Sequence, residues 1–199
     1  MKLEDCKVIF ATAGLIGILL FASPTLSLVF RLPSGEKFSE LWILGPNHMI
    51  EDYPFNVKAN EAYGIYVGVS NHMASSSYYV IKVKFRNQTE PLPDSSVGIP
   101  SPLQALYEYY IIIQNDKTFE TYLTFSFPQI SRYGNQCLVE AININDVMYT
   151  VHKPASWNVN YTGYFYQLFF ELWIYDVETE AFQFHNRFVN IWLNMTSPM

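Results

Sequence analysis

The pattern of hydrophobic and polar positions divides the chain into one long apolar run and a series of short alternating ones. Val8–Phe30 contains no charged residue and is bounded by Lys7 and Arg31. As a helix it would extend about 35 Å, and the hydrocarbon core of a bilayer is about 30 Å thick. The apolar runs after Arg31 are shorter and are broken by Asn, Glu, Lys or Gly. The pattern therefore predicts one transmembrane helix followed by a folded domain.

A cleaved secretory signal peptide is the alternative interpretation of the apolar run. Lys2 and Lys7 form a weak basic n-region, and residues 21–23, Phe-Ala-Ser, are similar to a cleavage zone. The run continues to Phe30, however, beyond the usual h-region of about 7–15 residues. We therefore expect an uncleaved anchor, in which Pro24 kinks the helix or ends its regular part.

Alternation of apolar and polar residues with a period of two recurs after the apolar run and predicts β-strands. One segment, Leu103–Gln114, also fits a helix face in part, but its Tyr-Ile-Ile-Ile run favours a strand from about Tyr107. Eight or nine strands at short spacing predict an all-β, antiparallel sandwich. The expected strands are Phe38–Leu44, Tyr63–Val69, Ser77–Arg86, Tyr107–Gln114, Thr118–Phe127, Cys137–Ile144, Val147–Val151, Gly163–Asp176 and Ala181–Asn194.

The faces of the expected strands predict the core. We interpret the opposite face of Ser77–Arg86, with Lys82, Lys84 and Arg86, as a solvated edge that deters aggregation. An anion or lipid-headgroup site is the alternative. In the last strand the apolar face changes parity near residues 186–187, which predicts a β-bulge. The expected core positions are Tyr79, Ile81, Val83, Phe85, Leu123, Phe125, Leu168, Phe170 and Leu172.

The second face of Gly163–Asp176 combines aromatic and polar residues. A strand buried on both faces rarely admits Gln and Glu, and a solvated face rarely carries four aromatic residues. We therefore expect a partly covered interface, in which aromatic anchors bury into a partner. The alternative is that a loop of the same chain, such as the proline-rich Glu90–Gln104, covers this face. The residues concerned are Phe165, Phe169, Trp173 and Tyr175, alternating with Gln167 and Glu171.

Charge and sequons suggest where the domain lies. The formal net charge of −6 argues against a nucleic-acid partner. Basic residues flank both ends of the apolar run, so the positive-inside rule gives little preference for either orientation in the membrane. Three N-glycosylation sequons follow, at Asn87, Asn160 and Asn194, and they favour a domain outside the cell. We expect a cytoplasmic segment 1–7, a transmembrane helix 8–30, a neck 31–37 and an extracellular domain 38–199.

Several motifs carry a family resemblance. Residues 38–47, FSELWILGPN, are followed by 51–57, EDYPFNV, and 64–72, GIYVGVSNH. With the closing stretch Phe165–Trp192, they resemble an uncharacterised family of archaeal membrane proteins, catalogued as domain of unknown function number sixteen-sixteen. The resemblance covers roughly residues 30–195 and implies an Ig-like or fibronectin-like sandwich outside the membrane, without a known activity. Many members carry several spans before this domain, and any role of those spans is not inherited by this chain.

The sequence offers little catalytic chemistry. The four histidines, at 48, 72, 152 and 185, lie far apart, and none has partners at metal-ligand spacing. The pair Glu51-Asp52 is expected in a turn, and Cys137 as a small buried side chain. Asn71-His72 is a candidate loop site, with a strand-end turn as the alternative.

No catalytic residue, cofactor or metal site is therefore predicted. We expect a non-catalytic binding, structural or accessory subunit of a cell-envelope or membrane complex. Its expected partners are the membrane, a protein and N-linked glycans. An enzyme whose site assembles from loops is the alternative.

Overall fold

The computed structural model describes residue 7, residues 10–18 and residues 36–196. The chain divides into two units, Met1–Lys37 and Phe38–Met199. In the first unit, residues 10–18 are helical. Among the described residues, no helix has both the length and the apolar character needed to cross a membrane. Most of the expected transmembrane run, residues 8–9 and 19–30, lies outside the described residues, as do 1–6 and the neck positions 31–35.

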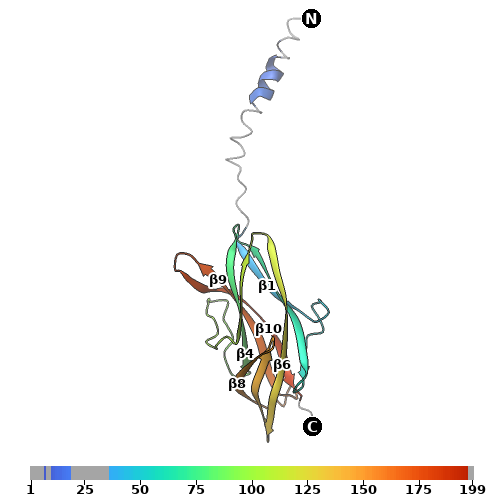
Figure 1. Ribbon diagram of the computed structural model, residues 1–199. Helices are drawn as coiled ribbons and strands as arrows, with labels where there is room; N and C mark the ends of the chain where they lie inside the picture. Colours follow the sequence, from blue (N-terminus) through green and yellow to red (C-terminus); the bar gives the residue numbers. More distant parts are fainter. Residues whose placement is uncertain (1–6, 8–9, 19–35, 197–199) are drawn as a thin grey trace. The chain divides into compact units, whose positions relative to one another are not determined.

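The second unit is a sandwich of two five-stranded sheets, which confirms the expectation of an all-β sandwich (Figure 1). The first sheet has the order β1-β3-β6-β7-β8, and the second has the order β2-β10-β9-β4-β5. All strand pairs are antiparallel except β2 with β10, which are parallel. The strands are β1 Phe38–Leu44, β2 Asn56–Val57, β3 Ala62–His72, β4 Ser77–Asn87, β5 Tyr107–Ile113, β6 Lys117–Tyr133, β7 Gln136–Ile144, β8 Val147–Ser156, β9 Phe165–Asp176 and β10 Ala181–Met195.

The core lies between the two sheets. All nine expected core positions are buried, with at most 2% of any side chain exposed. Their alternation in the sequence therefore identified the inner faces of β4, β6 and β9 correctly. Tyr166 also links the sheets, because its hydroxyl in the second sheet donates hydrogen bonds to the carbonyl oxygens of Cys137 and Lys153 in the first, at 2.8 and 3.0 Å.

Local sequence signals set the turns and the bulge. Asn145 and Asp146 connect β7 to β8 with φ values of 47° and 64°, as a tight hairpin turn with two left-handed residues requires. In β10 the pairing with β9 shifts register between Phe184 and Arg187. The bulge predicted from the change in parity is confirmed. It restores an inward apolar face in the second half of β10.

Two strands continue beyond their expected ends at Phe127 and Val151, and each passes through a proline. β6 passes Pro128 and reaches Tyr133, because its register with β7 shifts between Ser126 and Gln129 and the missing N–H falls in that irregularity. β8 includes Pro154 and reaches Ser156 because it is the edge strand of its sheet. The sequence-based ends of these two strands were therefore too early.

The interpretation of β4 as a solvated edge is wrong. β4 lies between β9 and β5 in the second sheet, so both of its sides are paired. Only 3% of Lys84 and 7% of Arg86 is exposed, while Lys82 is half-buried. The three basic side chains therefore lie on the outer face of a central strand, where other parts of the chain cover two of them.

Candidate functional site

The outer face of β9 is divided into a covered part and a partly exposed part. Phe165 and Phe169 are 7% and 0% exposed, and the intervening Gln167 is 2% exposed. Trp173 and Tyr175, nearer the end of the strand, are half-buried. Phe165 and Phe169 are therefore covered within this chain, whereas Trp173 and Tyr175 remain partly exposed, and the expected interface stays a prediction.

Residues 88–106, which connect β4 to β5, cover the middle of this face; we call them the covering loop. Its Ser101 is held by a buried ion pair. The backbone N–H of Ser101 donates to Glu171 Oε1 at 2.8 Å, and Lys84 Nζ donates to the Ser101 carbonyl at 2.7 Å. Lys84 Nζ also lies 2.9 Å from Glu171 Oε2. These contacts explain why a glutamate and a lysine are tolerated on a covered strand face.

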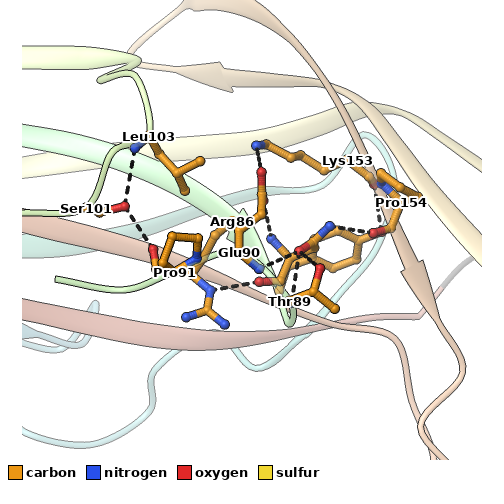
Figure 2. Close-up of polar contacts among 10 residues, drawn as sticks. Arg86, Thr89, Glu90, Pro91, Ser101, Leu103, Lys153 and Pro154 are labelled. Atoms are coloured by element: carbon orange, nitrogen blue, oxygen red, sulfur yellow. Dashed lines mark hydrogen bonds and ion pairs between the residues drawn. The ribbon is translucent and has the colours of Figure 1, made fainter. Parts of the chain in front are cut away.

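Further hydrogen bonds fix both ends of the covering loop (Figure 2). Ser101 Oγ donates to the Pro91 carbonyl at 2.9 Å, which joins the two proline-containing halves of the loop. At the start of the loop, Glu90 forms an ion pair with Lys153 of β8. Arg86 donates through Nε and Nη2 to the carbonyls of Asn87 and Gln88, each at 2.7 Å. The covering loop is therefore held in place by the rest of the sandwich.

The three sequon asparagines have different environments. Asn87 is 8% exposed; its Oδ1 accepts from the backbone N–H of Thr89 at 3.0 Å and its Nδ2 donates to the Pro154 carbonyl at 2.9 Å. Asn194 is half-buried, and its side chain bonds to Tyr164 N and to the Asn56 side chain. Asn160 is exposed in a turn. Asn160 is therefore the most exposed of the three sequon asparagines.

A pocket of about 490 Å³ opens where β9 begins and β10 ends. We call it the aromatic pocket. Phe165 forms its buried centre, at ring-centroid distances of 6.0 Å from Phe55, 6.1 Å from Tyr161 and 6.4 Å from Trp192. These three surrounding rings are 46%, 74% and 47% exposed. The lining residues are Phe55, Gln88, Asn158, Tyr161, Phe165 and Trp192.

Hydrogen bonds hold the walls of the aromatic pocket. The turn that carries Tyr161 is closed by Asn158 N donating to the Gly163 carbonyl at 2.9 Å. Asn158 Oδ1 also accepts from the backbone N–H of Asn160 and of Tyr161, at 3.1 and 3.2 Å. A Cβ at Gly163 would lie 2.3 Å from Asn194 Oδ1, so any other residue here would have to displace the Asn194 side chain. The wall on the other side is Phe55, whose carbonyl accepts from Asn194 N at 2.6 Å.

Sequence reasoning identified one of the six lining residues, Phe165, and missed the others. The outward position of Trp192 follows from its alternation with Ile191 and Leu193 after the bulge. That signal was available in the sequence. Phe55, Gln88, Asn158 and Tyr161 lie outside the longer strands, where no periodicity indicates what a side chain contacts.

A second aromatic surface lies toward the other end of β9, where the β9–β10 hairpin extends beyond the neighbouring strands (Figure 1). We call Tyr78, Tyr110, Tyr175 and Phe182 the aromatic patch. Phe182 is its centre, at ring-centroid distances of 4.9 Å from Tyr78, 5.8 Å from Tyr110 and 5.4 Å from Tyr175. Tyr78 is 37% and Tyr110 is 55% exposed. Tyr175, one of the expected interface residues, therefore belongs to a partly exposed cluster.

The remaining candidate groups are structural or isolated. His185 Nε2 lies 3.1 Å from Ser39 Oγ, but Ser39 is 1% exposed and also contacts the Tyr79 hydroxyl at 2.7 Å, so it joins the two sheets. His72 ends β3 and is 3.0 Å from Asp116. Cys137 is fully buried, and burial raises the pKa of its thiol. Within residues 36–196 and the described helix, no group of three or more His, Cys, Asp or Glu side chains is placed to hold a metal ion.

Comparisons with known proteins give a family and weak structural likenesses. A family model described as "Domain of unknown function (DUF1616)" matches residues 32–135. No curated protein matches the chain.

Three solved structures are similar over most of this chain, at low identity. A β-glucosidase from Listeria innocua has 11% identity and a TM-score of 0.43, covering 81% of this chain but 16% of that one. A complex of zinc 2-glycoprotein and prolactin inducible protein from human seminal plasma has 8% identity and a TM-score of 0.38, covering 82% and 99%. Bacteroides uniformis β-glucuronidase 2 has 11% identity and a TM-score of 0.35, covering 78% and 13%. These likenesses are too weak to bear on activity.

Proposed function

This chain belongs to the DUF1616 family, and from that premise we propose that it is a membrane-anchored, non-catalytic binding module. In this proposal residues 8–30 form a single-pass anchor and the sandwich lies outside the cell. There it contacts another component of the cell envelope or of a membrane complex. The aromatic pocket is the contact site, and Phe165 at its centre is one of the residues expected to form an interface.

The lining of the aromatic pocket is the observation that carries this proposal. Its six residues are four aromatics and two amides, and three of the rings are 46–74% exposed. Exposed aromatic rings around a buried one provide apolar area for a ligand without large loss of side-chain entropy. General acid–base catalysis needs a group that gains or loses a proton near neutral pH, and carboxamides do not. The site is therefore suited to binding.

The position of the pocket within the sandwich agrees with a tether before residue 38. Phe38 pairs with His72, and β4 begins nearby at Ser77. At its other end β4 reaches Asn87, which pairs with Tyr166 beside the pocket. Eleven residues of β4 extend about 35 Å. A tether would thus hold one end of the sandwich and leave the pocket at the opposite end.

The experiment compares wild type with variants in the two aromatic regions. The full chain is purified from its native membranes in mild detergent, and the co-migrating proteins and saccharides are identified. Trp192→Ser with Tyr161→Ser removes two exposed rings of the pocket, and Tyr110→Ser is the matched control in the aromatic patch. We expect a bound component that the pocket variant loses and the control retains. If both variants retain the same component, the pocket is not the contact site.

A further inference from the structure

We propose that the aromatic pocket binds a neutral saccharide ring, an inference that rests on the proposed function because it names the ligand of the same site. A pyranose ring has C–H groups on its faces and hydroxyl groups around its edge. A site that binds this ring therefore needs aromatic faces to pack against the C–H groups and hydrogen-bonding side chains to contact the hydroxyl groups. The pocket provides both. Its volume of about 490 Å³ lies in the range of small-molecule sites, about 300–1,000 Å³.

The aromatic component is built from three exposed rings around a buried one. Trp192, Tyr161 and Phe55 each lie within 6.4 Å of Phe165, measured between ring centroids. The face of an aromatic ring carries partial negative charge, and the C–H groups of a sugar carry partial positive charge, so stacking is favourable. A sugar can therefore stack its C–H face on these aromatic rings while the hydroxyl groups at its edge remain hydrated.

The polar component is partly pre-organised. Asn158 Oδ1 accepts two backbone hydrogen bonds from its own turn, which fix the plane of the amide. Among the contacts of the described residues, Asn158 Nδ2 has no hydrogen-bond partner, and neither has the side-chain amide of Gln88. Two amides at the rim of the pocket can thus donate to and accept from ligand hydroxyls. An amide that is held before binding loses less entropy when the ligand arrives.

Charge favours a neutral ligand. None of the six lining side chains is ionic at neutral pH. A sugar acid or a phosphorylated sugar would have to lose hydration of its charge without gaining an ionic partner. An apolar peptide side chain would also fit the rings, but it would leave the two amides without a partner. The combination of rings and amides therefore distinguishes a saccharide from both alternatives.

The test measures binding by the full chain, produced in a host without N-glycosylation and placed in lipid nanodiscs. Detergents with sugar headgroups are avoided because they would compete for the pocket. The probes are neutral trisaccharides of glucose, mannose and N-acetylglucosamine, with a triglucuronide as the charged control and an apolar tripeptide as the non-sugar control. Binding is measured by calorimetry and by tryptophan fluorescence.

We expect at least one neutral trisaccharide to bind and the triglucuronide to bind at least tenfold more weakly. Trp192→Ala should weaken binding by about tenfold, whereas Trp192→Phe should retain it in calorimetry because the ring remains. Gln88→Leu should weaken binding without changing the melting temperature. Tyr110→Ala, in the aromatic patch, should bind as wild type.

Two negative outcomes have different meanings. If the apolar tripeptide binds through Trp192 and no neutral trisaccharide does, the ligand class is wrong and the binding module remains. If neither the trisaccharides nor the tripeptide bind, and the double variant Trp192→Ser with Tyr161→Ser retains every component that co-purifies with wild type, both proposals are overturned.

Discussion

Lys84 and Glu171 form an ion pair that is almost completely removed from water, with Nζ 2.9 Å from Oε2 and side-chain exposures of 4% and 0%. Each charge has further partners. Glu171 accepts from the backbone N–H of Ser101 and from Trp173 Nε1, and Lys84 donates to the Ser101 carbonyl. The pair therefore connects β4 and β9 to the covering loop, residues 88–106.

Removing one member of this pair is expected to be costly. Glu171→Leu leaves the Lys84 charge buried without an anion and removes the partner of Ser101 N. The expected loss in the free energy of unfolding is about 3–5 kcal/mol, measured by urea denaturation. Lys84→Met with Glu171→Leu should lose less than the sum of the single changes, because neither charge is then left alone. Additive losses would show that the two side chains act independently.

The stability of the sandwich should depend on pH through His185. Burial, and secondarily the positive charge of Arg187, lowers the pKa of this imidazole below its ordinary value. The folded chain therefore holds His185 neutral, beside Ser39 and Tyr79, while the unfolded chain binds the proton at about pH 6.5. Stability from this group is complete above about pH 6.5 and is lost as the pH falls toward the lowered folded pKa.

His185→Gln is the corresponding control variant. It cannot take up a proton, and its amide can still bond to Ser39 Oγ. Between about pH 7.5 and pH 5, wild type should lose more of its free energy of unfolding than His185→Gln does. Equal losses in urea denaturation would mean that His185 is not the group responsible.

The sequons provide a prediction about stability that does not depend on whether they are glycosylated. Asn87→Ala removes the acceptor for Thr89 N and Glu90 N, and the donor to the Pro154 carbonyl. Buried groups left without partners should lower the free energy of unfolding by about 1–3 kcal/mol. Asn160→Ala, in an exposed turn, should change it by no more than about 0.5 kcal/mol. If Asn87→Ala leaves the free energy of unfolding unchanged, other groups or water replace these hydrogen bonds.

The inner layer of this sandwich was predictable from the sequence because burial imposes a period of two. Residues such as Ile81 and Phe170 alternate with polar or outward neighbours, and a one-residue slip would expose the whole row. The bulge in β10 was predictable for the same reason, since only an extra residue reconciles the two halves of the strand.

The outer layer was not predictable in the same way. Whether Phe169 and Lys84 are exposed depends on where residues 88–106 lie, and no periodicity in those residues gives their path. The aromatic pocket is also assembled from distant segments, because Phe55, Tyr161 and Trp192 meet only when β2, β9 and β10 are in register. The proline-rich loop was one stated alternative for covering β9, and the hydrogen bond from its Ser101 to Glu171 supports that alternative.

The expected membrane topology concerns residues that lie mostly outside the described part of the chain, and it stays a prediction. Val8–Phe30 carries no charge and has the length of a bilayer span. The chain should therefore remain in the membrane after extraction at alkaline pH, and protease added to intact cells or spheroplasts should remove the domain. A domain that is resistant in intact cells but cleaved in inverted vesicles would mean that the orientation is reversed.

Trp173 and Tyr175 lie two residues apart on the same strand face, and their substitution should have unequal effects. Trp173 Nε1 donates to the buried Glu171 at 2.9 Å, and Lys82 Nζ lies 3.9 Å from the centroid of the Trp173 ring. Trp173→Ser should therefore lower the free energy of unfolding by about 3 kcal/mol or more, through lost packing and the loss of one hydrogen bond to Glu171 Oε2, which keeps Lys84 as its partner.

Among the described residues, the Tyr175 side chain has ring contacts within the aromatic patch, with Phe182 at 5.4 Å and Tyr78 at 6.0 Å between centroids, and no side-chain hydrogen bond. Tyr175→Ser should therefore cost about 1 kcal/mol or less, because the ring is already half in water. Urea denaturation of the two variants distinguishes a structural aromatic residue from a surface one. If Tyr175→Ser destabilises the chain as much as Trp173→Ser, the aromatic patch belongs to the core, and no partner is needed to explain its four rings.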